Sequence, residues 1–600
     1  MSKIKITILR TLCSLPFVLC IFLIFNFSFL IEANATIRYV SHTGTSIPPY
    51  TTWETAADSI QKAIDICIDG DTVIVANGVY NESIFIDKTI NLWGSSADST
   101  IINGVGTPDI YIIYFFENNS TMKNFRLISP GYDKIGIYTR RSNLRAENCI
   151  IENVNNSPLS VNYSSVNISN FIIQVNVWGI IDECPNDTCH SVYSNNIITS
   201  SNTINTPVLF SFGGYPTFTN NIVIEEGGTL RGVQIQHNKG AKIKNNVVSG
   251  YDDINIRVVQ ILSDTAYFEN NNSFNSEVAY YTASPGRTII RNNIAKDVSK
   301  GIQSSFGTLT DYNLFWNVQE LISGTAVLGD SNITADPMFI KDTIPNSQLD
   351  FDYHLQAYSP AIDKGDPSIK DVDGSRSDIG MFGGPLGEKY SYKDLAPKSP
   401  RNLSATIDTN YILLKWNKNT EADTSYYNVF RDTVVNFSID STKLVGSTAD
   451  TFFIQYPPYK NSQYVYKITC IDNQRNESFP SEEVIIKTTS TDEYPYVVND
   501  YILYQNYPNP FNPITIIGYK LKERGYVKLM VYDIKGELIS ILVNKEQEAG
   551  YYEVEFVGRD LINQIRTNYL ASGIYLYRIE VIGEGNIPVY ADMKKMVLIK

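Results

Sequence analysis

The sequence predicts an all-β protein: a parallel β-helix with an N-terminal helical cap, followed by two small β-sandwich domains. Three observations predict this class. Asparagine followed by an apolar residue recurs every 20 to 26 residues between 124 and 314, alternating apolar strands fill 400–489, and similar strands fill 490–600. A fixed period of twenty-odd residues indicates a solenoid in which each repeat is one coil.

Bulk composition narrows the class of protein. The chain has 600 residues, of which 19% are charged and 43% hydrophobic, so it is long enough for several domains with substantial cores. A formal net charge of -14 argues against a nucleic-acid partner, because phosphate binding needs a clustered basic face. The 4 histidines leave few candidates for imidazole catalysis. We expect a monomer that binds no nucleic acid.

Residues 1–35 have the pattern of a signal peptide. Basic residues precede an apolar run from 12 to 31, and the small residues ending at Ala35 are typical of a cleavage site. We therefore expect Sec export to the periplasm with cleavage after Ala35. The run is also long enough for an uncleaved membrane anchor, which is the alternative. Further along, Cys184 and Cys189 suit a local disulfide or free thiols better than a metal site, because His190 completes only a partial zinc set.

The repeated asparagines have a structural explanation. Segments such as "KIKNNVVSG" are β-branched bursts between turn residues, without the leucine spacing of leucine-rich repeats. Equivalent residues of successive coils stack about 4.8 Å apart, so inward asparagines can hydrogen-bond to one another. We expect Asn246 to be such a rung and Asn245 to turn the corner in left-handed backbone. The predicted column consists of Asn124, Asn148, Asn170, Asn196, Asn221, Asn246, Asn271, Asn293 and Asn313.

A short amphipathic segment precedes the repeats. Its apolar residues at 56, 60, 63, 64 and 67 predict a helix that begins after Thr52 and ends at Gly70. Such a helix covers the open end of the core and the unpaired edge of the first coil.

Three phrases mark the ends of the repeat region, which spans 36–390. They are "IRYVSHTG", "GDTVIVANGVYNESIFI" and the closing "DPMFI...YHLQAYSPAIDKGDP...DVDGSRSDIGMFGG". The region resembles the right-handed parallel β-helix proteins of the pectin-lyase-like superfamily, in their extracellular bacterial form. That family contains lyases, hydrolases, epimerases and non-catalytic adhesins, so the resemblance implies a fold and leaves the function to be argued from the site.

Two further modules follow a proline-containing linker at 391–399. In 400–489 the strands "NYILLKWNK", "SYYNVFRD" and "QYVYKITCIDNQRNESFPSEEVIIKT" resemble a fibronectin type III domain, with Trp416 in the core and Tyr464 as its tyrosine corner. This resemblance implies a non-catalytic spacer.

The last module, 490–600, contains "YQNYPNPFNPITIIGYKL", "VKLMVYDIKGELI" and "ASGIYLYRIEV". These phrases closely resemble the C-terminal sorting domain of the type IX (Por) secretion system of Bacteroidetes-like bacteria. The resemblance implies that the type IX secretion machinery carries the protein to the cell surface or medium. A plain structural β-domain is the alternative.

The candidate catalytic residues lie on the middle coils: Asp252, Asp253, Arg257, Lys239 and His237. A polysaccharide lyase needs a base and a cation, and a glycoside hydrolase needs two spaced carboxylates. The sequence motifs of polygalacturonases and pectate lyases are absent.

Solenoid spacing also predicts two outer columns. One consists of Glu226, Asp252 and Glu277, and the other of Arg231 and Arg257. Stacked carboxylates repel unless calcium or arginine intervenes, and a solvated charged face is the simpler interpretation.

A cation site is suggested by "DVDGSRSD", in which Asp371, Asp373 and Asp378 are candidate calcium ligands. Calcium is the one cofactor that the sequence suggests, and turn-forming aspartates are the simpler account. As a whole, the sequence predicts a secreted or cell-surface protein that binds extracellular polysaccharide or mediates adhesion. The alternative is a polysaccharide lyase or glycoside hydrolase that acts through the middle coils.

Overall fold

The structure is a computed structural model that divides into two compact units, 1–394 and 395–600. Their boundary falls inside the predicted linker. The predicted signal peptide, apart from Ala35, and Glu226 lie outside the described residues. The structure describes residues 35–185, 188–201, 206–225, 231–284, 288–341, 351–407, 411–455, 463–487, 500–506, 509–512, 514–558, 570–583 and 587–599.

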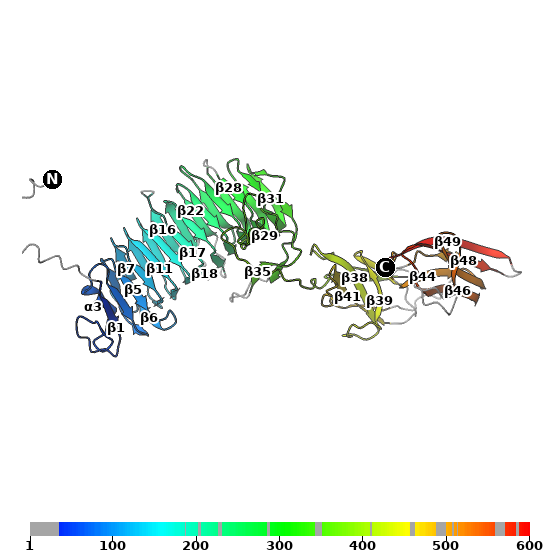
Figure 1. Ribbon diagram of the computed structural model, residues 1–600, viewed down its shortest axis with the longest axis horizontal. Helices are drawn as coiled ribbons and strands as arrows, with labels where there is room; N and C mark the ends of the chain where they lie inside the picture. The colour runs from blue at the N-terminus through cyan, green and yellow to red at the C-terminus, as the bar shows by residue number, and fades with distance from the viewer. Residues whose placement is uncertain are drawn as a thin grey trace, which may run out of the picture. The chain divides into compact units, whose positions relative to one another are not determined.

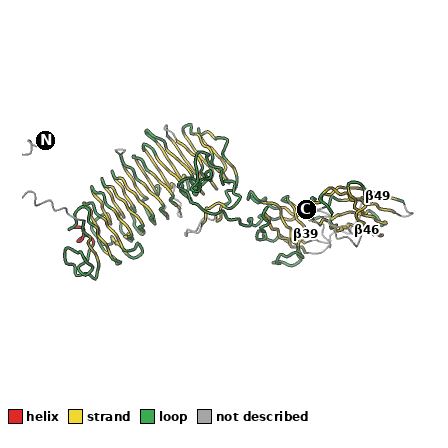
Figure 2. Tube along the Cα trace, viewed as in Figure 1, coloured by secondary structure: helices red, strands yellow, loops and turns green. Residues whose placement is uncertain are grey.

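The first unit is a parallel β-solenoid, as predicted, and Figures 1 and 2 show its strands stacked coil upon coil. Within the described residues, 13 strands form one sheet and 20 form the other. The first sheet contains β1 (Ile37–Val40), β2 (Thr72–Val75), β5 (Asn91–Gly94), β8 (Thr121–Lys123), β11 (Asn143–Glu147), β14 (Ser165–Ser169), β17 (Val192–Ser194), β20 (Thr217–Thr219), β23 (Ala241–Lys244), β26 (Ala266–Glu269), β28 (Thr288–Arg291), β30 (Leu309–Asp311) and β32 (Val327–Leu328).

The 20-stranded sheet is made of two ladders, because each early coil contributes two short strands to it. One ladder contains β3 (Gly78–Tyr80), β6 (Thr100–Asn103), β9 (Arg126–Ile128), β12 (Ile150–Glu152), β15 (Ile172–Val175), β18 (Ile197–Ser200), β21 (Ile222–Glu225), β24 (Val247–Ser249) and β33 (Ile333–Thr334). The other contains β4 (Ile84–Ile86), β7 (Tyr111–Phe116), β10 (Ile135–Arg140), β13 (Leu159–Asn162), β16 (Ile180–Cys184), β19 (Leu209–Gly213), β22 (Arg231–Gln236) and β25 (Ile254–Val259). The long strands β27 (Asn272–Ala283), β29 (Ile294–Ser304) and β31 (Leu314–Gly324) belong to both ladders and join them.

Inward side chains form the core by stacking on their equivalents in the next coil. One such column runs along the first sheet at a single register position, and nearly all its members are apolar and buried. Alternate residues point outward, as expected for strands. The column contains Val73, Leu92, Met122, Ala146, Ile168, Tyr193, Phe218, Ile243, Phe268 and Ile290.

The asparagine ladder is confirmed from Asn196 onward. The side-chain amide of each rung donates to the side-chain oxygen of the next at 2.9 to 3.1 Å, and the ladder extends to Asn332. Each oxygen also accepts the backbone N–H of the preceding rung. These buried amides are therefore satisfied by one another.

The prediction was wrong for Asn124, Asn148 and Asn170. These three have φ of 63, 55 and 57, and the buried rung position beside them holds Phe125, Cys149 and Phe171. They belong to the corner column, whose later members are Asn195, Asn220, Asn245, Asn270 and Asn292, all with positive φ. Asparagine tolerates this left-handed backbone, so the expected role of Asn245 is confirmed.

The helical cap is shorter than predicted. Helix α3 (Ile60–Asp65) begins at the N-cap Ser59 rather than near Thr52, because Ala57 instead pairs with Val40 beside the first strand. The carboxylate of Glu82 accepts the backbone N–H groups of Ile60 and Gln61 at 2.8 and 2.9 Å, which satisfies two free donors of the first turn. In Figure 1 the helix lies beside β1 at the first coil.

Residues 336–394, here called the strap, return along the solenoid after the last coil. Strands β34 (Phe339–Lys341) and β35 (Asp352–Leu355) pair antiparallel within it. The corner amide of Asn245 donates to the Met381 and Gly383 carbonyls at 2.8 and 2.6 Å, and that of Asn270 donates to the Asp378 carbonyl at 2.9 Å. The corner asparagines of these coils therefore hold the strap.

The second unit contains two pairs of antiparallel sheets. The first pair comprises β36 (Ser404–Ile407), β37 (Ile412–Lys415) and β40 (Phe452–Gln455), against β38 (Thr424–Asp432), β39 (Leu444–Thr448), β41 (Gln463–Asp472) and β42 (Val484–Lys487). The second pair comprises β43 (Ile502–Leu503), β44 (Ile514–Leu521) and β47 (Gly550–Val557), against β45 (Gly525–Asp533), β46 (Leu538–Gln547), β48 (Gly573–Ile582) and β49 (Pro588–Leu598). Trp416 and Tyr464 are buried in the first core, as predicted.

Two smaller expectations were also tested. Cys184 and Cys189 form the local disulfide, with Cα atoms 6.0 Å apart, and Cys67, Cys149 and Cys470 are buried free thiols. Among the described residues, no helix has both the length and the apolar character needed to cross a membrane.

Replacing one rung should loosen the coils around it. Asn246→Ala leaves the side-chain amide and backbone N–H of Asn221 without their shared acceptor, so we expect a loss of about 3 kcal/mol in the free energy of unfolding of the first unit. Urea unfolding of the full chain, followed by tryptophan fluorescence, measures it. Asn167→Ala, at an exposed position of β14, is the control and should change stability by less than about 0.5 kcal/mol. Equal effects of both variants would contradict the role of the ladder.

Candidate functional site

An aromatic column covers the outer face of the first coils of the 20-stranded sheet. Phe85, Tyr114 and Tyr138 occupy one register position of β4, β7 and β10. The ring centroids of Phe85 and Tyr114 lie 5.3 Å apart, and those of Tyr114 and Tyr138 lie 4.8 Å apart. Tyr111 and Phe116 flank Tyr114 at 5.0 and 5.9 Å. The five rings form a continuous, partly exposed surface on a rigid sheet, here called the aromatic face.

Further along, the same outward register position carries polar and charged side chains. Gln234, Arg257 and Tyr281 follow one another there, and the Arg257 guanidinium lies 5.4 Å from the Tyr281 ring centroid. Burial lowers the pKa of Arg257, and the positive charge of Arg231 lowers it further. Arg231 in turn forms an ion pair with Asp253 at 3.5 Å. The structure therefore brings Asp253 and Arg257 into one charged cluster.

The other predicted residues lie elsewhere. His237 directly follows β22, and its ring packs against Phe212 with centroids 4.9 Å apart, whereas Asp253 directly precedes β25. Because these strands are parallel and in register, His237 lies at the opposite end of the strand pair from Asp253, about 20 Å away. Lys239 lies beyond His237, and Asp252 is an exposed residue one position before Asp253. The five candidates do not converge on one groove.

The two predicted charge columns are out of register. Arg231 is level with Ile254, and Arg257 is level with Gln234. Ile254 is level with Val278, so Asp253, and not Asp252, lies beside Glu277. The reason is that coil length on this face is 22 to 24 residues rather than 25 or 26. Glu277 instead pairs with Lys300 at 3.0 Å, one coil further on.

The candidate calcium ligands Asp371, Asp373 and Asp378 serve as hydrogen-bond acceptors within the strap. The carboxylate of Asp371 accepts the Asp378 N–H at 2.9 Å and also the Gly384 N–H. Asp373 accepts the Ser375 N–H and hydroxyl at 2.9 and 2.6 Å. Within the described part of the chain, these three do not form a cluster with metal-ligand spacing. Calcium binding here stays a prediction, and the turn-forming interpretation accounts for every contact named.

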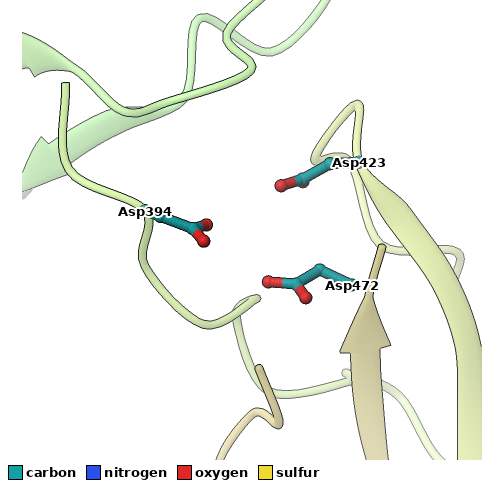
Figure 3. A group of neighbouring side chains, drawn as sticks. All are labelled: Asp394, Asp423 and Asp472. Atoms are coloured by element: carbon teal, nitrogen blue, oxygen red, sulfur yellow. The ribbon is translucent and has the colours of Figure 1, made fainter. Parts of the chain in front are cut away.

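Asp423 and Asp472 are two buried carboxylates in the second unit. They lie at the ends of adjacent strands, just before β38 and at the end of β41, and Figure 3 shows their carboxyl groups pointing to the same side. Asp472 accepts the N–H groups of Gln474 and Asn476 at 2.9 and 2.8 Å. These bonds account for Asp472 as a turn-stabilising residue.

No family model matches the chain, and no curated protein matches it. Among solved structures, a fibronectin type III-like protein from Clostridium thermocellum is 24% identical over 16% of this chain and 99% of its own, with a TM-score of 0.14. The spore cortex lytic enzyme SleM of Clostridium perfringens is 22% identical over 19% of this chain and 34% of its own, with a TM-score of 0.14. Dimeric latent PorU from Porphyromonas gingivalis is 12% identical over 35% and 21%, with a TM-score of 0.15. Similarities of this size carry no evidence about function.

The sequence analysis missed the aromatic face. Phe85, Tyr114 and Tyr138 are separated by 29 and 24 residues, which hides their common register because the coils differ in length. A search for exposed aromatics near one coil period upstream of Asn148 could have found the last two. The first requires the strand register itself.

The strap should be held more firmly in acid. Burial raises the pKa of Asp378, which accepts the Asp363 N–H and the Tyr392 hydroxyl, to about 6. Since this folded-state pKa lies above the unfolded value, the stabilising contribution is fully present below pH ~4 and is lost as the pH rises through about 6. The free energy of unfolding should therefore fall by about 3 kcal/mol more in the unmodified chain than in Asp378→Asn between pH 4 and pH 7. Urea unfolding at both pH values measures this difference, and parallel pH profiles would contradict it.

Proposed function

We propose that this chain is a secreted or cell-surface protein whose β-solenoid binds extracellular polysaccharide or mediates adhesion through it. The aromatic face is the observation that carries the proposal. A sugar ring presents an apolar face of C–H groups, and an exposed aromatic ring on a rigid sheet offers a flat partner for it with little loss of conformational freedom. Five such rings in contact provide several neighbouring stacking positions.

The arrangement of the charged candidates favours binding over turnover. General acid–base catalysis needs groups within hydrogen-bond reach of one reacting atom. Asp253 and Arg257 lie in one charged cluster, whereas His237 and Lys239 lie at the other end of the strands. A lyase or hydrolase is the second candidate, and the lowered pKa of Arg257 beside Asp253 is the observation that favours it. Release of unsaturated uronides or reducing ends from a polysaccharide panel would favour the enzyme.

Export by the type IX secretion machinery is part of the proposal. It is supported by the phrases in 490–600 that resemble the sorting domain, and by the separate antiparallel sheets that this segment forms. The fibronectin-like module at 400–489 serves as a spacer between the solenoid and the exported end.

Removing one ring from the centre of the aromatic face should weaken binding. Tyr114 contacts four other rings of the face, so Tyr114→Ala should reduce affinity for the polysaccharide bound best by the full chain about tenfold. Affinity electrophoresis across a panel of neutral and acidic polysaccharides measures this change. Tyr426→Ala, a partly exposed tyrosine of the second unit, is the control and should bind normally. An unchanged affinity in Tyr114→Ala would overturn the proposed site.

Deleting 490–600 should block release. In a bacterium that has the type IX system, we expect the truncated chain to remain in the periplasm while the full chain reaches the surface or medium. Fractionation and immunoblotting measure the distribution. Surface delivery of the truncated chain would contradict the proposed route.

A further inference from the structure

A cavity of about 450 Å³ lies on the outer face of the other sheet, where the strap passes over it. Its floor is formed by outward residues of β23, β26 and β28, and its opposite wall by Ile369, Pro385 and Leu386 of the strap. This volume lies in the range of small-molecule sites. The lining combines charged side chains with an aromatic ring and an apolar wall.

The charges on the floor almost neutralise one another along one register position. Lys244, Glu269 and Arg291 are level on successive strands, and Glu269 is buried between the two cations. Arg291 donates to Glu269 at 2.6 Å and to Asp366 of the strap at 2.6 Å, and Lys244 is ion-paired with Glu269. These four side chains therefore form a rigid, paired network.

Lys242 is the cation left over. It lies on the neighbouring outward position, level with Tyr267, and no described residue forms an ion pair with it. Three cations, Lys242, Lys244 and Arg291, against the two carboxylates Glu269 and Asp366 leave one net positive charge. The Tyr267 ring lies beside Lys242, so a ligand could present one negative group to the ammonium and a ring face to the tyrosine.

We propose that this cavity binds one monoanionic oxyanion group, a sulfate ester or a carboxylate, that is carried on a sugar ring. The inference deepens the proposed function, on which it rests, by adding a charge-selective subsite on a different sheet from the aromatic face. The solenoid would then hold an acidic polysaccharide in preference to a neutral one, because only an acidic sugar compensates Lys242.

The test uses the full chain and three monosaccharide probes: glucose 6-sulfate, glucuronate and glucose. Isothermal titration should detect one-to-one binding of at least one anionic sugar and at least tenfold weaker binding of glucose. Lys242→Gln should weaken anion binding at least tenfold, whereas Lys242→Arg should retain it. Leu386→Asp, at a partly exposed wall position, should also abolish it by supplying a competing carboxylate. Lys123→Gln, on β8 of the same sheet, is the matched control.

The two anionic probes identify the source of the charge: binding of glucose 6-sulfate alone assigns a sulfate ester, and binding of glucuronate alone a carboxylate. Equal affinity for glucose, unchanged anion binding in Lys242→Gln, or no binding of either anion at millimolar concentration would overturn the inference. Tyr114→Ala separates this result from the proposed function. It should leave monosaccharide anion binding unchanged, so failure of the aromatic face and failure of this cavity give different outcomes.

Discussion

Register between successive coils is the constraint on which the rest of the first unit depends. Every outward column, whether aromatic or charged, exists only because each strand pairs with its equivalent at a fixed height. The buried ladder from Asn196 to Asn332 enforces that height, since each side-chain amide must meet the oxygen of the next rung at 2.9 to 3.1 Å. A slip of one residue would bury unsatisfied amides and turn every outward side chain inward.

The paired asparagines of the middle coils have two separate tasks. In "KIKNNVVSG", Asn246 satisfies its neighbours inside the core, whereas Asn245 adopts left-handed backbone and directs its amide to carbonyl groups of the strap. The first task stacks the coils, and the second holds the returning chain against the solenoid. The cavity beside Lys242 depends on both, because its floor is set by coil register and its wall by the position of the strap.

The outer surfaces divide the proposed binding between two kinds of chemistry. The aromatic face on β4, β7 and β10 offers apolar contact without charge. The cavity over β23, β26 and β28 offers a single unpaired cation among paired ones. Between them, the Arg231, Asp253 and Arg257 cluster is linked by an ion pair and mutual electrostatics. Such pairing keeps stacked charges on a parallel sheet from repelling one another.

The sequence by itself determined the solenoid, its period and the presence of two β modules, because periodic asparagines and alternating apolar residues report directly on coil length and strand faces. It also determined the roles of Asn246 and of Trp416, whose patterns are local. Only the tertiary structure decided which side chains share a column, since coils of 22 to 30 residues place Arg231 beside Ile254 and Phe85 beside Tyr114. It likewise decided that Asn148 and Asn170 turn corners. The physical reason is that loop length varies freely at the corners while hydrogen bonding fixes the strands, so sequence spacing alone does not give the register.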